Sequence, residues 1–412
     1  MSEGGIFLLA GEASGDRLGA ALMRRLREIA PERPLYGVGG EAMEAEGLRS
    51  LFPMQDLAVM GFAEVIPSLP RILRRLKQAT AEIARLKPAA LVTIDAQGFS
   101  KRLQTRAREV SPQTARVHYV APTVWAWKPG RAQKLAGLID HLMALFPFEP
   151  PYFTVHGLSC DFVGHPAAER VGEADPRAAE ALARDLGLSP EAPVLVALPG
   201  SRRGEIARLA EPFGAALGLL KGRHPDLQAL LPMAEGSAAL AVEAAARWPV
   251  RPHLLDPRGQ PFAQSEARKF AAFRLTARDE TRRGGAALAA SGSVTLELAA
   301  CGAPMVVGYK AHPLSAAIAR RLLKIDTATL PNLLSGEKAI PEYFQEDCTP
   351  EALAAALEPL LRSGPGRARQ ERAAARALAA LGGGPGEELP SLRAARSLLA
   401  AIRRKEAAAI VS

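Results

Sequence analysis

The residues of the carboxyl half that could do chemistry include a small-residue turn, Ser291-Gly292-Ser293, and a carboxylate, Glu297, about one helical turn later. A turn that opens a helix lets a phosphate approach the backbone N–H groups of the first helical turn. Glu297 would then reach the hydroxyls of a sugar attached to that phosphate. The pattern suggests a nucleoside diphosphate site. The alternative is that this is an ordinary strand-to-helix connection and that Glu297 is a solvated side chain.

A second loop in the carboxyl half, Pro199 to Glu205, has a related composition. It follows an apolar segment, enters a predicted helix and contains Ser201 and Arg202. A helix N-terminus and a guanidinium both favour a diphosphate. We therefore expect Ser201 and Arg202 to contribute to the same nucleotide site.

Acid–base chemistry in the amino half is suggested by Asp95, which follows the apolar segment 90–94. A carboxylate at the end of a buried strand can take a proton from an attacking hydroxyl. The alternative is that Asp95 caps the helix that follows. Glu12 and Asp16 flank a Gly-bounded loop, where they would either bind substrate hydroxyls or cap and orient a helix.

Two stretches could contact sugar, acyl or lipid groups. Trp125 and Trp127 lie in a Pro-containing loop, where they would line a ligand site or pack in a core. The segment 60–77 interleaves apolar residues with clustered arginines, which suits a surface that dips into an anionic membrane. The alternative is an amphipathic helix packed on its own sheet. The residues assigned to this surface are Met60, Phe62, Arg71, Arg74 and Arg75.

Other kinds of site are not indicated by the sequence. The three cysteines, Cys160, Cys301 and Cys348, are too widely separated for a disulfide framework or a metal cluster. His118 and His165 have no other metal ligands beside them in the sequence. A P-loop lysine motif and a strict G-x-G-x-x-G are both missing, which argues against an ATPase or an NAD-dependent dehydrogenase. We expect neither a metal nor a cofactor.

The elements that must position these residues alternate between apolar strands and helices, the pattern of a parallel α/β sheet. Two series of strands are predicted, at 6–10, 35–38, 90–94, 117–120 and 141–146, and at 193–198, 227–232, 253–255, 286–290 and 305–309. Ligands of such sheets bind at the carboxyl ends of the strands. We expect two doubly wound, Rossmann-like domains, 1–168 and 169–365, facing across a cleft. A helical tail, 366–412, is expected to pack back on the first domain.

Composition is compatible with this arrangement. The chain has 412 residues and a net charge of +9, which suits phosphorylated substrates, an anionic membrane surface or nucleic acid. The sequence contains no apolar run of the ~18–20 residues that a membrane span requires. Its first residues carry no basic segment or cleavage site of a signal peptide, so we expect a cytosolic protein.

Taken together, these motifs closely resemble the lipid-A-disaccharide synthase family, over about residues 5–360. The segments that carry the resemblance, in order, are GEASGD (11–16), AVMGFAEV (58–65), TIDAQGF (93–99), HYVAPTVWAWKPGR (118–131), FPFEPPYF (146–153), FVGHP (162–166), LPGSRRGEI (198–206), AASGSVTLELAACGAPMVVGYK (289–310) and LPNLLSGEKAIPEYFQEDC (330–348).

The resemblance implies an inverting GT-B glycosyltransferase that acts peripherally at the cytoplasmic face of the inner membrane. Its donor would be UDP-2,3-diacylglucosamine and its acceptor 2,3-diacylglucosamine 1-phosphate (lipid X). The products would be the β-1,6-linked disaccharide 1-phosphate and UDP. A homodimer is left open, and no nucleic-acid partner is expected.

The family's functional positions fall on Asp95, Glu12, Arg202 and Asn332. Either Asp95 or Glu12 would be the general base for the acceptor's 6-hydroxyl. The carboxyl-side domain holds UDP in this family, which agrees with the site predicted above. The UDP-sugar residues expected are Ser201, Arg202, Ser291, Gly292, Ser293, Glu297 and Asn332.

The sequence departs from the family pattern in two places. Gln97 stands where the family usually has Pro, and Gly98 where it usually has Asp or a similar polar residue. The charged stretch 275–284 comes before the nucleotide turn, where the family passes directly into a strand. It is either a surface insertion or an altered stretch of sequence.

Two other functions compete with this interpretation. One is another GT-B UDP-sugar transferase or epimerase with a soluble substrate, against which the apolar and basic segment 60–77 argues. The other is a nucleic-acid-binding protein without catalysis, which the net charge suggests. The sequence shows no stripe of basic and aromatic residues to favour it.

Overall fold

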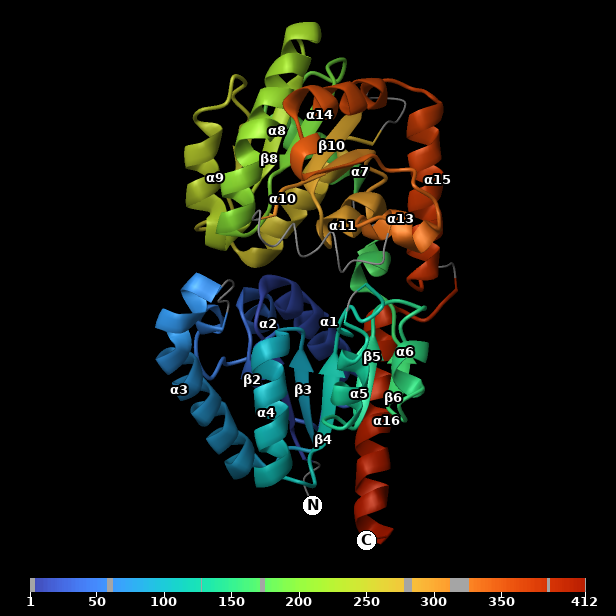
Figure 1. Cartoon of the computed structure of the whole chain (residues 1–412). Helices are drawn as coiled ribbons and strands as arrows, with labels where there is room; N and C mark the ends of the chain where they lie inside the picture. The colour runs from blue at the N-terminus through green and yellow to red at the C-terminus, as the bar shows by residue number, and fades with distance from the viewer. Residues whose placement is uncertain are drawn as a thin grey trace. The chain divides into compact units, whose positions relative to one another are not determined.

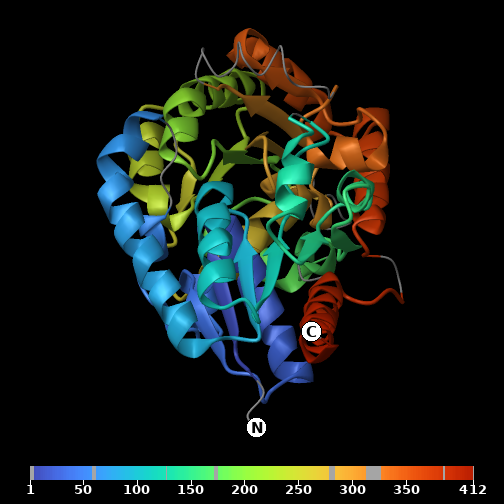
Figure 2. The same cartoon turned by 60° about the horizontal axis from the view of Figure 1, so that its bottom comes forward.

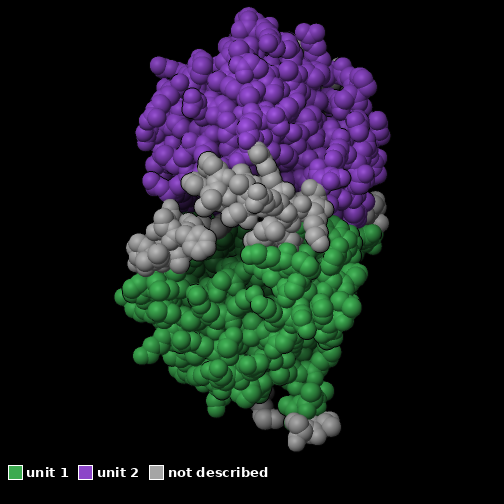
Figure 3. Space-filling view, in the orientation of Figure 1, with its two compact units in different colours: residues 1–166, 385–412 green, residues 167–384 purple. Residues whose placement is uncertain are grey.

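The computed structural model describes residues 4–57, 62–126, 128–170, 175–277, 284–311, 326–383 and 386–411. The chain divides into two compact units (Figure 3). Unit 1 comprises residues 1–166 and 385–412, and unit 2 comprises residues 167–384. The stretch that we had grouped as one tail is therefore divided: α15 (Pro365–Ala380) belongs to unit 2 and α16 (Pro390–Val411) to unit 1.

Unit 1 contains a six-stranded, all-parallel sheet in the order β2-β1-β3-β4-β5-β6. Its strands are β1 (Ile6–Ala10), β2 (Leu35–Val38), β3 (Ala90–Ile94), β4 (Ala115–Tyr119), β5 (His141–Ala144) and β6 (Ser159–Phe162). Every residue of β1 and β3 is buried, because helices cover both faces of a parallel sheet, and Thr93 is the one polar residue of these two strands.

The helices of unit 1 lie on both faces of this sheet (Figure 1). They are α1 (Ala13–Ile29), α2 (Glu41–Ala45), α3 (Phe62–Leu86), α4 (Gln97–Val110), α5 (Arg131–Ala136), α6 (Pro151–Thr154) and α16. α3 packs against α4, and α16 packs against α1, β4 and β5. Figure 2 shows α16, in red, beside the blue α1 from a second direction. The last helix of the chain thus completes the first unit.

Unit 2 contains a second all-parallel sheet, in the order β12-β11-β10-β7-β8-β9. Its strands are β7 (Val194–Leu198), β8 (Gln228–Pro232), β9 (His253–Leu255), β10 (Gly285–Ala290), β11 (Met305–Tyr309) and β12 (Glu342–Phe344). Besides α15, the α-helices described in this unit are α7 (Pro176–Asp185), α8 (Arg203–Arg223), α9 (Ala238–Ala245), α10 (Phe262–Arg274), α11 (Val294–Ala300), α13 (Leu330–Ser335) and α14 (Pro350–Leu357).

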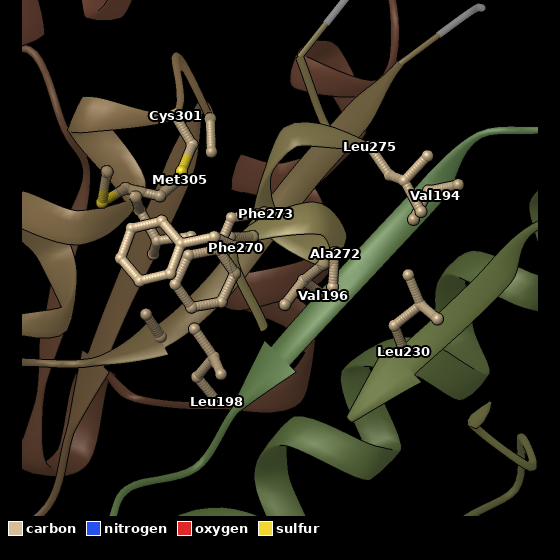
Figure 4. Close-up of a cluster of buried hydrophobic side chains, with 14 of the residues drawn as sticks. Val194, Val196, Leu198, Leu230, Phe270, Ala272, Phe273, Leu275, Cys301 and Met305 are labelled. Carbon is tan, nitrogen blue, oxygen red and sulfur yellow. The ribbon is translucent and has the colours of Figure 1, made fainter. Parts of the chain in front are cut away.

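Buried aromatic side chains in the core of unit 2 determine the position of α10. Figure 4 shows Phe270 and Phe273 of this helix among aliphatic side chains that come from β7, β8 and β11. The two rings lie 5.7 Å apart between centroids, and both are buried. Full burial of such side chains stabilises the fold by about 1.5–3 kcal/mol each relative to exposure. α10 is fixed against the sheet by this contact.

The strand orders indicate where a ligand site is expected in each unit. In a doubly wound sheet, ligands bind where the strand order reverses, because the helices that follow the two adjacent strands lie on opposite faces there. In unit 1 this switch point lies between β1 and β3, with Ala10 paired to Ile94. In unit 2 it lies between β7 and β10, with Leu198 paired to Ala289. The loops that leave these strands carry the residues that the sequence analysis selected.

Among the described residues, none of the helices is both long and apolar enough to cross a membrane.

Candidate active site

The switch point of unit 1 is formed by the loops that follow β1 and β3. A Cβ atom placed on Gly11 would lie 2.5 Å from the Cβ of Ala96, so the two loops touch and only glycine fits at this contact. Glu12 lies two residues after the end of β1, and Asp95 directly follows β3. The topology therefore brings together, at one edge of one sheet, the two carboxylates that we expected to act as acid–base groups.

Asp95 has an unusual backbone conformation. Its φ is +51°, and the φ of Ala96 is +44°, so two consecutive non-glycine residues are left-handed. The Asp95 N–H donates to the carbonyl of Tyr119 (3.0 Å), and Ser100 Oγ donates to the carbonyl of Asp95 (2.7 Å). The N-cap of α4 is Ala96 rather than Asp95, so capping of this helix does not explain the carboxylate. Asp95 is half-buried.

The two acidic residues of the first loop have different surroundings. Asp16 is buried and accepts hydrogen bonds from the backbone N–H groups of Gly40 (2.8 Å), Ala42 (2.9 Å) and Met43 (3.1 Å). It thus binds the start of α2, although burial raises the pKa of this carboxyl above its ordinary value. Glu12 is half-buried at the N-cap of α1, where its side chain makes no capping bond. Asp16 has a structural role, and Glu12 stays a candidate.

A buried carboxyl that the sequence analysis did not select, Glu149, lies beyond the end of β5. It accepts hydrogen bonds from Trp125 Nε1 (3.2 Å) and from the N–H of Phe146 (3.0 Å). The Trp125 ring meets Phe148 edge-on at 5.3 Å. Burial raises the pKa of Glu149 to about 7. Its position among aromatic residues in the segment FPFEPPYF was the available signal. Trp125 is half-buried, and Trp127 lies outside the described residues.

Only part of the expected membrane surface lies within the described residues. Leu69 and Leu73 of α3 are exposed (39% and 45%), whereas Leu76 is buried. Arg71 and Arg74 are also exposed. Asp56 pairs with both Arg75, with Nη2 2.7 Å from Oδ2, and Arg71, with Nε 3.6 Å from Oδ1. Arg75 also stacks 5.0 Å from the Phe52 ring centroid. Met60 and the Phe62 side chain lie outside the description.

In unit 2, the loop after β7 turns at Gly200, whose φ is +123°. Glu205 in the first turn of α8 accepts from the N–H groups of Ser201 (3.1 Å) and Arg202 (3.3 Å), and Arg202 Nη1 donates to the same carboxylate (3.2 Å). Glu205 is buried, while Ser201 and Arg202 are exposed. Two backbone donors expected for a phosphate are therefore bound by Glu205, which the sequence analysis had not assigned.

The second turn of unit 2, Ser291-Gly292-Ser293, joins β10 to α11 and is half-buried. Ser291 Oγ donates to the carbonyl of Ala328 (3.0 Å), which ties the turn to the segment before α13. Gly292 has a φ of +158°, and a Cβ atom placed on it would meet nothing within 4 Å. The backbone of this turn can be approached closely at Gly292.

Glu297 in α11 is not the solvated side chain of the alternative interpretation. It is 7% exposed, and its Oε2 lies 3.0 Å from Lys269 Nζ on α10. Lys269 also pairs with Glu266 at 2.7 Å. Lys269 is 28 positions away in sequence, so no local pattern indicated this pair. The ammonium fixes the orientation of the carboxylate expected to bind ribose.

Asn332 in α13 is engaged within the protein. Its Nδ2 donates to the carbonyl of Ile340 (2.9 Å), and its Oδ1 accepts from the N–H groups of Ala339 (3.1 Å) and Ile340 (2.9 Å). The side chain is 2% exposed. It braces the connection to β12, whose Glu342 in turn accepts from the N–H groups of Ala328 and Thr329.

The stretch 275–284 is described only at its two ends, since residues 278–283 lie outside the described residues. Arg367 of α15, which is 4% exposed, binds both ends. It donates to the carbonyls of Thr276 (2.9 Å) and Gly285 (2.8 Å). Thr276 and Gly285 are also joined directly, by a hydrogen bond of 2.8 Å from the N–H of Gly285. The unusual stretch thus begins and ends at one fixed point of the sheet.

Within the residues that the structure describes, His, Cys, Asp and Glu side chains form no group that could hold a metal ion.

Two doubly wound units, each with polar loops at its switch point, define the GT-B class, as the sequence motifs predicted. Two solved structures share this fold. One is the UDP-GlcNAc 2-epimerase of Neisseria meningitidis bound to UDP-GlcNAc, with a TM-score of 0.60, 9% identity and coverage of 97% of this chain and 98% of that chain. The other is the calicheamicin glycosyltransferase CalG4, with a TM-score of 0.55, 15% identity and coverage of 98% and 99%.

Sequence comparison identifies the family. The profile of the lipid-A-disaccharide synthetase family matches residues 6–384. The lipid-A-disaccharide synthase of Ruegeria pomeroyi is 47% identical over 399 residues, covering 96% of this chain and 94% of its own length. That of Rhodospirillum centenum is 44% identical over 401 residues, covering 97% and 95%. The chain belongs to the lipid-A-disaccharide synthase family, as the motifs predicted, and it is a glycosyltransferase; the alternative of a soluble substrate is not favoured.

Proposed function

We propose that this chain transfers 2,3-diacylglucosamine from UDP-2,3-diacylglucosamine to lipid X with inversion, and that Asp95 is its general base. The observation that carries the residue assignment is the backbone at Asp95. Two successive non-glycine residues with positive φ occur there, at the same switch point of unit 1 as Glu12. Strained residues of this kind cluster at functional sites and persist where the surrounding structure holds them.

The proposed reaction is a single displacement. The 6-hydroxyl oxygen of the acceptor forms a bond to the anomeric carbon of the donor while the bond from that carbon to the UDP oxygen breaks. Asp95 takes the hydroxyl proton, and Glu12 is the second candidate for this role. UDP departs with the electron pair of the broken bond, so negative charge develops on its β-phosphate.

Unit 2 would stabilise the departing UDP. The Arg202 guanidinium and the backbone of the Ser291–Ser293 turn are suited to the diphosphate, and Glu297, oriented by Lys269, to the ribose hydroxyls. We assign Ser201 to the edge of this site, because Glu205 already binds its N–H. Asn332 would act indirectly, by shaping the loop before β12. The proposed mechanism invokes no metal ion and no cofactor.

The assay that tests this function uses the purified chain, the acylated UDP-sugar and lipid X. We expect formation of the disaccharide 1-phosphate and release of UDP. The Asp95→Asn and Glu12→Gln variants separate the two candidate bases, and loss of one should lower turnover by about 10²–10⁴-fold. If both variants fold and keep near-native turnover, the acid–base assignment is wrong. Equal activity on a de-acylated donor would instead support a soluble substrate.

Peripheral contact with an anionic membrane surface is part of the proposal, since both substrates carry acyl chains. Exposed Leu69 and Leu73 lie beside Arg71 and Arg74 on α3, which suits shallow insertion and attraction to anionic headgroups. Arg75 would orient this helix through Asp56, which also pairs with Arg71. Met60 and Phe62 complete the segment in sequence. We place the enzyme at the cytoplasmic face of the inner membrane.

Vesicle sedimentation tests the membrane contact. The Leu69→Ser/Leu73→Ser double variant should bind anionic vesicles less than the unaltered chain. Leu219→Ser is the matched control, because Leu219 is an exposed leucine (37%) of α8 in unit 2. Equal loss in the control and in the double variant would contradict the assignment to α3.

A further inference from the structure

One buried histidine of unit 1 connects the strand and the helix on either side of Asp95. His118 on β4 is 2% exposed. Its Nδ1 lies 2.8 Å from Thr93 Oγ1, on β3, and its Nε2 lies 3.1 Å from Gln97 Nε2, at the first residue of α4. Thr93 and Gln97 lie two residues before and two residues after Asp95. The histidine therefore bridges the base of the turn that presents the carboxylate.

The partners of His118 determine its protonation. With the Gln97 amide nitrogen facing the ring, this nitrogen donates, His118 Nε2 accepts and the ring proton is on Nδ1. Thr93 Oγ1 is then the acceptor for Nδ1–H, and it also accepts from Gln104 Nε2 (3.0 Å). The other hydrogen of this Gln104 amide goes to the carbonyl of Val117 (2.9 Å).

Burial supports the same protonation state. It lowers the pKa of His118 to about 4, with a further small contribution from the positive charge of Lys101. The imidazole is therefore neutral at physiological pH and stays a hydrogen-bond acceptor at Nε2. A charged ring would place an N–H against the Gln97 amide hydrogens, and the bond would be lost. The interaction is a fixed structural link rather than a switch near neutral pH.

The link holds a turn that is unfavourable on its own. Asp95 and Ala96, with φ of +51° and +44°, lie between the two partners of His118. A side chain of ordinary type resists this conformation, so the surrounding contacts must enforce it. The bond from Asp95 N–H to Tyr119 holds the start of the turn, and the bond from Gln97 to His118 holds its end. Without the second bond, the turn could relax and the carboxylate would move.

We propose that His118 is a positioning residue for the reaction: through Gln97 it holds the left-handed turn that aims the Asp95 carboxylate. The proposal rests on the role of Asp95 as general base proposed above. The role of His118 requires no contact with either substrate. Its effect on catalysis is exerted through the geometry of the turn.

Two shape-conserving variants test the link. Gln97→Met removes the donor at a half-buried position, and His118→Phe removes both ring nitrogens. Because a small misplacement of a catalytic group is costly, we expect each variant to lower kcat by about tenfold or more. KM for both substrates should change by less than about twofold, since ground-state binding is not altered. The double variant should be no slower than His118→Phe, because both changes break the same bond.

His141→Phe is the matched control. His141 is also buried on a strand of the same sheet and is bonded through both ring nitrogens, to Ser159 (2.9 Å) and to Ser397 of α16 (2.7 Å). It lies at the first residue of β5, the opposite end of the strands from Asp95. The control should lose stability and keep kcat. If His118→Phe behaves like the control, with stability lost and kcat kept, His118 is merely structural and the proposal fails.

Nitrogen NMR of ¹⁵N-labelled histidine gives a readout that does not depend on turnover. We expect His118 to show the Nδ1–H tautomer and no titration between about pH 5 and pH 8. In Gln97→Met the Nε2 resonance should shift, because this nitrogen loses its donor. Titration close to the ordinary value, or an Nε2 resonance unchanged in Gln97→Met, would overturn the proposal even if His118→Phe does not fold.

Asp95→Asn in the disaccharide assay distinguishes failure of the base assignment from failure of the positioning role of His118. If Asp95→Asn is inactive and Gln97→Met keeps native kcat, only the positioning role of His118 is wrong. If Asp95→Asn keeps native turnover, the base assignment is wrong and the positioning role falls with it.

Discussion

The two units both have turns with positive φ at the ends of their strands, but they form these turns with different residues. In unit 1 the strand ends carry non-glycine residues with positive φ, Asp95 (+51°), Ala96 (+44°) and Val120 (+81°). In unit 2 the corresponding turns use glycine, Gly200 (+123°) and Gly292 (+158°). Glycine adopts such angles without strain, whereas other residues adopt them at a cost of about 1–3 kcal/mol each.

The difference follows from which part of the residue the proposed function requires, the side chain in unit 1 and the backbone in unit 2. A phosphate is bound by backbone N–H groups, so a glycine that lets the ligand approach loses nothing by lacking a side chain. In the proposed mechanism Asp95 is the general base and must have its side chain, so glycine would not serve there and the turn has to be held by other contacts. The comparison predicts that glycine at position 95 lowers turnover without lowering stability, and that strain introduced at Gly200 lowers stability and raises KM for the UDP-sugar.

The largest effect is expected for Asp95→Gly. The change removes the strain together with the carboxylate, so turnover should fall by about 10²–10⁴-fold. The free energy of unfolding should stay the same or rise by up to about 1 kcal/mol, because glycine tolerates this φ. Turnover in the disaccharide assay and urea unfolding measure the two quantities. Ala96→Gly is the control: it relieves a φ of +44° without removing a carboxylate, so it should keep turnover. Loss of stability in both variants would contradict the account of strain.

The second effect concerns Glu149, which holds Trp125 in the loop that begins at the left-handed Val120. The pKa of Glu149 is raised by burial from 4.5 to about 7, so the folded protein binds more protons than the unfolded chain between these values. The contribution of this group to stability is therefore complete below about pH 4.5 and is lost as the pH rises to about 7. The loss amounts to at most about 3 kcal/mol.

Urea unfolding between about pH 5 and pH 8 tests this behaviour. Stability should decline with pH in the unaltered chain and less steeply in Glu149→Gln, which has no group to ionise. Glu243→Gln is the control, because the Glu243 side chain is 65% exposed on α9. Parallel profiles for the unaltered chain and Glu149→Gln would show that Glu149 does not titrate in this range.

The third effect is expected for Gly200→Ala in unit 2. Alanine would be strained at a φ of +123°, and its Cβ would lie 2.5 Å from the Cβ of Glu205, which binds the loop. We expect a loss of about 1–3 kcal/mol of stability and a rise in KM for the UDP-sugar of about tenfold, because the loop and Arg202 must shift. Gly222→Ala is the control at the other end of α8, where a Cβ meets nothing within 4 Å. If KM is unchanged in Gly200→Ala, this loop does not contact the nucleotide.

The sequence predicted the sheets better than the turns. The spans 6–10, 35–38, 90–94 and 305–309 agree with β1, β2, β3 and β11, because buried parallel strands are continuous apolar runs. β6 and β12 were missed. They are edge strands with exposed or half-buried residues, so no apolar run marks them.

The candidate site residues could be selected from sequence, but their contacts could not. Asp95 and Glu12 were selected as candidates because they follow predicted strands. The left-handed φ of Asp95 was not foreseeable, since glycine is the residue that normally signals it. Likewise, Asp16 binds N–H groups 24 to 27 positions away, and Lys269 reaches Glu297 from another helix. Such pairs depend on tertiary packing.

The smallest effect is expected at Gly98, the position where the family usually has a polar residue. Gly98 is exposed in the first turn of α4, its φ is not among the positive values, and a Cβ placed on it meets nothing within 4 Å. Gly98→Ala should therefore raise the free energy of unfolding by about 0.5–1 kcal/mol, because alanine loses less backbone entropy in a helix. Turnover should be unchanged, since the turn at Asp95 is held by other residues. A fall in turnover without a change in KM would instead show that the turn needs the freedom of glycine directly after it. Both switch points would then depend on a glycine, and they would differ less than their φ angles suggest.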